Sequence, residues 1–185
     1  IADAANAINP DVIIYGEGWT CADSPLPVER RALKEAVSKM PGIAVFSDEM
    51  RDGIRGPFYN DTQGAFLTGV PGHEMSVMHG LVGCIAHPQI DCSQVNHTQK
   101  PWAQQPTQMI SYVSCHDDLC LADRVRMTLP KWATCQEAIK LQKLALTIVL
   151  TSQGIPFLFA GDELMRNKKG VCNSYNSPDE INAID

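Results

Sequence analysis

The stretch TCQEAIKLQKLALTIVLTSQGIPFLF, residues 134–159, contains a helix followed by a strand and decides the fold class. Thr134 and Glu137 have the spacing of a capping box, in which each side chain binds the free backbone amide of the other residue. Apolar residues then recur on one face and predict an amphipathic helix; they are Leu141, Leu144, Ala145, Ile148 and Val149. Gly154 ends the helix, and Ile155–Phe159 predicts a short buried strand.

Three earlier apolar runs predict strands of the same kind, at Asp11–Tyr15, Ile43–Phe46 and Met109–Val113. Apolar stripes between them predict helices over residues 33–40 and within residues 64–83. Each predicted strand is short and apolar, as expected for strands that are buried on both faces of a parallel sheet.

Two long loops are expected as well, a Gly-rich one from Ser47 to about Gly64 and a polar one over residues 86–108. Strands that alternate with helices in this way predict parallel βα units, an α/β fold. Four strands fit either a small doubly wound domain or half of a (β/α)₈ barrel. A whole barrel takes about 250 residues, more than this chain contains.

The composition is that of a globular chain with an acidic balance. Of 185 residues, 15 are basic and 21 acidic, a net charge of −6 that argues against a nucleic-acid-binding surface. Apolar residues make up 44%, enough for a core. The longest apolar run, Leu141–Leu150, carries polar interruptions and is shorter than the ~20 residues of a membrane helix. Seven cysteines, an odd number without a CxxC pair, are interpreted as buried or free thiols.

Acidic residues follow three of the predicted strands. Glu17 lies between two glycines after the first strand, Asp48 follows the second, and His116-Asp117-Asp118 follows the third. Because the carboxyl ends of parallel strands line the active site in such folds, we expect these side chains to share a site. A single strand-end acid also serves as a helix cap, so the joint pattern carries the prediction.

These residues carry a resemblance to a known family. Tyr15–Trp19, of sequence YGEGW, resembles the third signature segment of type I pullulanases in the alpha-amylase superfamily (glycoside hydrolase family 13), and Tyr112–Asp117 resembles the fourth. Ser47–Gly56 resembles the segment after barrel strand six, and Gly154–Glu163 resembles strand eight. The resemblance implies that residues 1–185 form strands five to eight of a single TIM (β/α)₈ barrel, a half-barrel fragment.

The resemblance also implies roles for individual residues. Glu17 would be the general acid that later serves as base, and Asp117 would stabilise the oxocarbenium-like transition state. His116 would bind the same sugar ring, and Trp19 would stack on the substrate. Further candidates for binding glucose units on the non-reducing side are Asn173, Tyr175 and Asp179.

The sequence departs from the family pattern at several positions. The family's nucleophile, an aspartate in an Arg-Phe-Asp segment after strand four, has no match, and Asp3 lies in a predicted helix instead. We therefore expect the nucleophile upstream of Ile1 and an inactive fragment. Smaller departures, which concern sugar contacts on the plus side, are Asp118 for asparagine, Ala122 for tryptophan and Glu49 for arginine.

The implied substrate is an α-glucan with α-1,6 branches, such as pullulan, amylopectin or dextrins, with no nucleic-acid or membrane partner. No cofactor and no metal ligand are assigned; calcium is left open for the full-length enzyme. The charged residues Arg51, Asp52 and Arg55 form either a buried ion network or an exposed surface.

Two other functions stay open at this point. One is a metal-binding module, built from His73, His79, Cys84, His87, Cys92 and His97. Their spacing matches no common zinc pattern, so loop histidines and buried thiols are the preferred interpretation. The other is a non-catalytic carbohydrate-binding or half-barrel assembly unit, whose open sheet edges would favour self-association.

Overall fold

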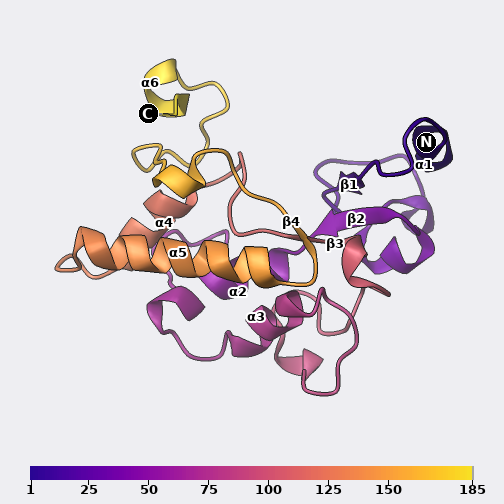
Figure 1. Cartoon of the computed structure of the whole chain (residues 1–185), viewed down its shortest axis with the longest axis horizontal. Coiled ribbons are helices and arrows are strands. Elements are labelled where there is room, and N and C mark those ends of the chain that lie inside the picture. Colours follow the sequence, from indigo (N-terminus) through magenta and orange to yellow (C-terminus); the bar gives the residue numbers. More distant parts are fainter. Residues whose placement is uncertain (185) are drawn as a thin grey trace.

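The centre of the molecule is a sheet of four parallel strands in the order β1-β2-β3-β4 (Figure 1). The computed structural model describes residues 1–184. The strands are Ile14–Gly16 (β1), Ile43–Phe46 (β2), Met109–Ser111 (β3) and Ile155–Pro156 (β4). Since spatial order equals chain order, each connection returns to the neighbouring strand, as in the wall of a barrel. The predicted parallel α/β fold is confirmed; β2 has the predicted bounds, and the other three strands are shorter than their apolar runs.

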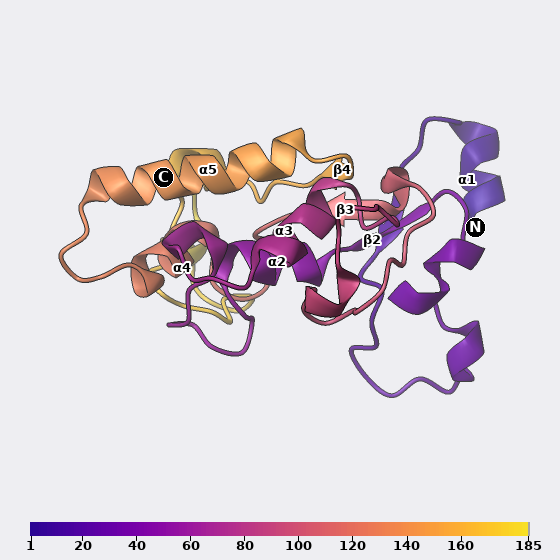
Figure 2. The ribbon, with the colours of Figure 1, turned by 90° about the horizontal axis from the view of Figure 1, so that it is seen from below.

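The helices fill the connections between the strands. They are α1 (Ala2–Ile8), α2 (Asp48–Arg55), α3 (Glu74–Leu81), α4 (Leu121–Thr128), α5 (Cys135–Thr151) and α6 (Asp179–Asn182). Helices α3 and α4 pack beside the long α5, and α2 packs against α3 and α4. Helix α1 lies at the opposite end of the molecule, near β1 (Figures 1 and 2). Among residues 1–184, no helix has the length and apolar character needed to cross a membrane.

Helix α5 begins as predicted from its sequence. The Thr134 hydroxyl accepts a hydrogen bond from the Glu137 amide at 3.2 Å, and the Glu137 carboxylate accepts one from the Thr134 amide at 2.6 Å. Ala145, Ile148 and Val149 are buried, whereas Leu144 is exposed. The buried face is therefore narrower than the predicted stripe.

Helix α2 corrects the prediction of a continuous loop from Ser47 to about Gly64. The Ser47 hydroxyl caps the helix by accepting a hydrogen bond from the Met50 amide at 3.3 Å. Gly53 allows close packing against α3, because a Cβ atom there would lie 2.7 Å from the Cβ of Ser76. A glycine that suggests a loop in the sequence is thus a contact point between two helices.

Two further segments differ from the prediction. Within the predicted helix at residues 33–40, the structure forms a 3₁₀ helix over Lys34–Lys39. Helix α4 was not predicted, since its buried residues include the charged Asp123 and Arg124, which break the apolar stripe. The helix expected within residues 64–83 is confirmed as α3.

The sheet separates two apolar clusters. Val45 and Met109 point toward the helices and join the main core, whereas Ala44, Ile110 and Tyr112 form a smaller cluster on the other face. Rings from all four strand segments meet edge to face in this smaller cluster; they are Tyr15, Phe46, Tyr112 and Phe157. The face opposite the helices is thus aromatic, and Tyr15 leaves half of its surface exposed.

Asp162 generates a first prediction, because its carboxylate is buried and neither oxygen has a hydrogen-bond partner. Burial raises its pKa from 3.8 to about 7. Ionisation therefore costs more in the folded chain than in the unfolded one, and stability should fall as the pH rises from 3.8 to about 7. Asp162→Asn removes the cost of ionising this carboxyl group. Between about pH 4 and pH 8, the free energy of unfolding of the variant should therefore rise by on the order of 2–4 kcal/mol relative to the native chain.

Urea unfolding of both proteins across this pH range measures the difference. Glu180→Gln is the matched control, since that side chain is exposed and does not contribute to the pKa of Asp162. A stability difference between Asp162→Asn and the native chain that stays constant with pH would contradict the assignment.

Candidate active site

A cavity of about 580 Å³ opens at the carboxyl ends of the four strands. Glu17 and Trp19 reach it from the segment after β1, His116 and Asp117 from the segment after β3, and Phe157 from the segment after β4. The parallel sheet thus gathers side chains that are up to 142 positions apart in the chain (Tyr15 and Phe157) around one cavity. Four of the seven predicted site residues meet here.

The other three predicted residues lie elsewhere. Asn173, Tyr175 and Asp179 do not line the cavity. They belong to the C-terminal segment that contains α6, which lies apart from the sheet, above α4 in the view of Figure 1. Tyr175 leaves 82% of its surface exposed. Their role in binding glucose units stays a prediction.

The backbone around Glu17 is fixed by glycine. Gly18 has a φ of +80°, and a Cβ atom there would lie 2.8 Å from the Cβ of Val45 in the neighbouring strand. Only glycine combines that conformation with that approach. The Cys21 thiol donates a hydrogen bond to Glu17 Oε2 at 2.6 Å, and this contact raises the thiol pKa.

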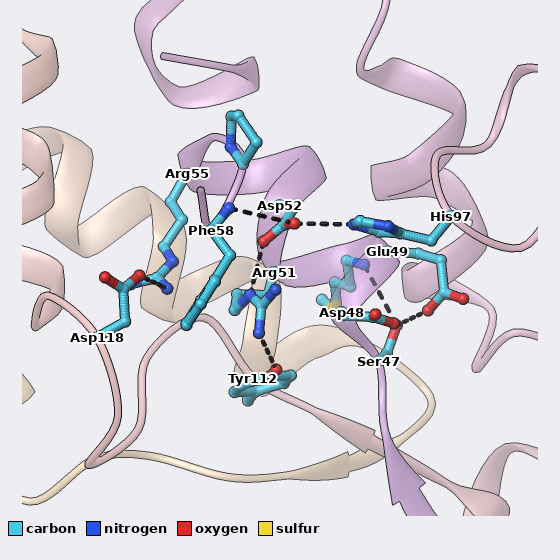
Figure 3. A network of polar contacts seen from close by, with 12 residues as sticks. Ser47, Asp48, Glu49, Arg51, Asp52, Arg55, Phe58, His97, Tyr112 and Asp118 are labelled. Atoms are coloured by element: carbon cyan, nitrogen blue, oxygen red, sulfur yellow. Dashed lines mark hydrogen bonds and ion pairs between the residues drawn. The ribbon is translucent and has the colours of Figure 1, made fainter. Parts of the chain in front are cut away.

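Asp117 and His116 present exposed side chains to the cavity. Within this pair of neighbouring residues, the side-chain atoms His116 Nε2 and Asp117 Oδ1 lie 3.3 Å apart. The next residue behaves differently: Asp118 is buried and pairs with Arg55 at 2.7 Å (Figure 3).

The three smaller departures from the family pattern all lie outside the cavity lining. Asp118 faces Arg55, Ala122 is buried in α4, and Glu49 is buried beneath Lys34. The expected changes in sugar contacts at these positions have no support in the geometry.

The sequence left open whether the charged residues of α2 are buried, and the structure places them in a buried network (Figure 3). Arg51 Nε donates to Asp52 Oδ1 at 2.6 Å, and Arg51 Nη1 donates to the Tyr112 hydroxyl at 2.8 Å. His97 Nε2 lies 2.8 Å from Asp52 Oδ2. All four residues line the cavity. The sequence pattern indicates His97 only as a candidate metal ligand, because its partner Asp52 is 45 positions away.

This network controls the charge of Asp52. Burial alone would raise its pKa, but hydrogen bonds from His97 and Arg51 outweigh burial and lower the pKa to about 2. Burial raises the pKa of Tyr112, so its hydroxyl stays protonated at neutral pH. The floor of the cavity therefore combines a fixed negative charge with a fixed positive one.

The candidate metal ligands do not form a binding site in the described residues. Within the part of the chain that the structure describes, no three His, Cys, Asp or Glu side chains gather closely enough to hold a metal ion. The seven cysteines all lie in this part and are free thiols. The geometry thus offers the metal-binding interpretation no support.

The pKa of Asp52 generates a second prediction. Its lowered value means that ionised Asp52 stabilises the fold above pH 3.8, and that this stabilisation is lost as the pH falls toward about 2. Asp52→Asn should cost about 2 kcal/mol at neutral pH, and the cost should shrink below about pH 4. Chemical denaturation at a series of pH values measures this.

Asp61→Asn provides the control for Asp52→Asn, since Asp61 pairs with the buried Arg124 but is itself 39% exposed. Its effect should be smaller and nearly constant with pH. If the cost of Asp52→Asn were equally constant, the network would not hold Asp52 ionised.

The chain is similar in sequence to known pullulanases. No protein-family model matches the chain. A pullulanase of Bacillus subtilis (strain 168) is 34% identical over 183 residues, which cover 99% of this chain and 24% of the relative. A chloroplastic pullulanase 1 of Arabidopsis thaliana is 30% identical over 208 residues, with 94% of this chain and 21% of the relative covered. The chain thus spans less than a quarter of the length of these relatives.

Solved structures agree with the sequence relatives. A pullulanase from Paenibacillus barengoltzii in complex with maltotetraose superimposes with a TM-score of 0.88 at 38% identity, over 99% of this chain and 27% of that one. A type I pullulanase from Bacillus subtilis in complex with maltose gives a TM-score of 0.88 at 34% identity, over 99% of this chain and 24% of that one. In sequence and in fold, nearly the whole chain is therefore homologous to one part of the catalytic barrel of the pullulanases, consistent with the alpha-amylase superfamily.

Proposed function

We propose that the chain is the C-terminal half of the catalytic barrel of a retaining, pullulanase-type glycoside hydrolase. The whole enzyme would cleave α-1,6-glucosidic bonds in pullulan, amylopectin or dextrins. One observation carries the proposal: Glu17 and Asp117 line the same cavity, in a chain whose homologues are pullulanases.

The proposed chemistry uses two carboxylates of this chain. Glu17 protonates the glycosidic oxygen as the bond breaks, and then deprotonates the water that completes hydrolysis. Asp117 binds hydroxyl groups of the glucose ring and stabilises the positive charge of the oxocarbenium-like transition state. His116 donates a further hydrogen bond to that ring, and Trp19 supplies an apolar platform.

Retaining hydrolysis also needs a nucleophilic carboxylate about 5–5.5 Å from the acid. Asp48 and Asp52 also line the cavity, but Asp48 is paired with Lys34, and Arg51 and His97 occupy both oxygens of Asp52. We therefore place the nucleophile in a part of the enzyme outside these 185 residues. The chain alone is proposed to bind glucan without cleaving it.

The class of ligand is supported by the relatives. Pullulanases of similar fold are described in complex with maltose, maltotriose, maltotetraose, and maltohexaose with α-cyclodextrin. A cavity of about 580 Å³ is in the ordinary range for a small-molecule site. Its aromatic lining suits the apolar faces of glucose rings.

Glucan binding generates a third prediction. Titration of the chain with maltotriose should shift the indole NMR signal of Trp19 with a millimolar dissociation constant, and Trp19→Ala should weaken binding by about tenfold. Trp132→Ala is the matched control, because that indole is 78% exposed and lies outside the cavity. Equal weakening by both variants, or no binding by the native chain, would reject the proposed ligand site.

The assignment of the nucleophile is tested separately, with pullulan as substrate. The purified chain should release no reducing sugar, because one of the two carboxylates that retention requires is missing. Release that Glu17→Gln abolishes would show that the chain contains its own nucleophile.

A fourth prediction is that the chain self-associates, because its sheet has two edge strands, each unpaired on one side, in the described residues. Within the described residues, β1 and β4 each pair with a strand on one side only. The aromatic face beside them includes the half-exposed Tyr15. Light scattering should detect a dimer that Tyr15→Lys weakens, whereas the exposed control Trp132→Lys should leave it intact. A compact monomer at high concentration would contradict the prediction.

A further inference from the structure

We propose that Arg55 and Asp118 form a clamp that positions the Asp117 carboxylate in the cavity. This inference rests on the proposed function and assigns Arg55 and Asp118 as positioning residues, which act through Asp117. The observation behind it is a buried ion pair attached to the residue next to Asp117 (Figure 3).

The clamp holds the chain at two consecutive points. Arg55 Nη2 donates to Asp118 Oδ2 at 2.7 Å, and Arg55 Nη1 donates to the Leu119 carbonyl at 2.7 Å. The side chains of Arg55 and Asp118 are 2% and 4% exposed, so water does not compete for these bonds. Charge-assisted hydrogen bonds from one planar guanidinium fix direction as well as distance.

The backbone at Asp118 needs such support. Its φ of +63° is in the left-handed region, which L residues avoid and aspartate tolerates better than most. A residue persists in that conformation when its surroundings hold it there. The turn it produces lets Asp117 face the cavity while Asp118 faces the protein interior.

Asp117 itself has little to hold it. Its side chain is 63% exposed, and its ion-pair partner among residues 1–184 is His116, which is 76% exposed. Such an exposed contact contributes little order. The direction of the Asp117 carboxylate must therefore come from the backbone on which it sits.

The other end of the clamp is anchored. Arg55 is the last residue of α2, and its carbonyl accepts a hydrogen bond from Arg124 Nε at 3.3 Å. Arg124 is fully buried and also donates to the Pro57 and Asn60 carbonyls at 2.7 Å each. These contacts hold the end of α2 in place, and with it the position of the Arg55 guanidinium.

A stabilising role alone explains this pair poorly. Taking two charges out of water costs about as much as their attraction returns, so apolar side chains would fill the space at least as well. What a buried ion pair adds is a defined geometry for the chain around it.

The test compares three variants of the chain by NMR. Asp118→Gly keeps the left-handed backbone accessible but removes the bond to Arg55, and Asp118→Asn keeps an oxygen acceptor for it. Asp61→Gly is the matched control, since it removes an exposed carboxylate partner of Arg124 outside the cavity but leaves the bonds from Arg124 to the Arg55, Pro57 and Asn60 carbonyls in place. The measurements are the Asp117 carboxyl ¹³C shift, backbone order at residues 116–118 and maltotriose affinity.

The clamp predicts that Asp118→Gly shifts the Asp117 signal, lowers the order of residues 116–118 and weakens maltotriose binding by about tenfold. Asp118→Asn should recover most of each change, and Asp61→Gly should cause none. Should Asp118→Gly not fold, Arg55→Gln replaces it with the same expected loss.

Unchanged Asp117 shift, order and affinity in a folded Asp118→Gly or Arg55→Gln variant would overturn the clamp. So would equal losses in Asp61→Gly, which would indicate general destabilisation. A native chain that does not bind maltotriose would reject the proposed function, while the shift and order measurements would still decide on the clamp.

Discussion

The pairing of buried charges on α2 is the interaction on which the site depends. This helix buries Glu49, Arg51, Asp52 and Arg55. Unpaired charges cannot be placed in a protein interior at acceptable cost, so each must meet a partner. The partners come from other segments: Lys34 for Glu49, Tyr112 and His97 for the central pair, and Asp118 for Arg55. Helix, strand ends and loops are thereby held in one arrangement around the cavity.

Much of the fold could be predicted because its strands are short apolar runs bounded by glycine, proline and acidic residues. The capping box of α5 could also be predicted, since Thr134 and Glu137 lie three residues apart. Helices α2 and α4 were missed for the opposite reason. Their buried positions hold paired charges, and the sequence of one segment does not reveal partners that lie 60 or more positions away.

The same division applies to the site. The position of Glu17, Trp19, His116 and Asp117 at the cavity could be predicted because each lies within six residues of a strand's carboxyl end, and these ends meet at one edge of a parallel sheet. Asn173, Tyr175 and Asp179 follow no strand directly, and the structure places them away from the cavity. His97 and the aromatic pair Phe58 and Tyr59 line the cavity from loops, whose course the sequence pattern does not determine.

The distance along the chain between the paired charges has a consequence for synthesis. Arg51 and Arg55 leave the ribosome more than 60 residues before Tyr112 and Asp118, their partners. Until those partners emerge, burial of α2 would leave Arg55 without its counter-charge and Arg51 without its hydroxyl acceptor, so burial of the helix is unfavourable at that stage. Long-range contacts of this kind slow folding, because the intervening chain must close before they form. The cavity can therefore assemble only after β3 and the turn behind it have been translated.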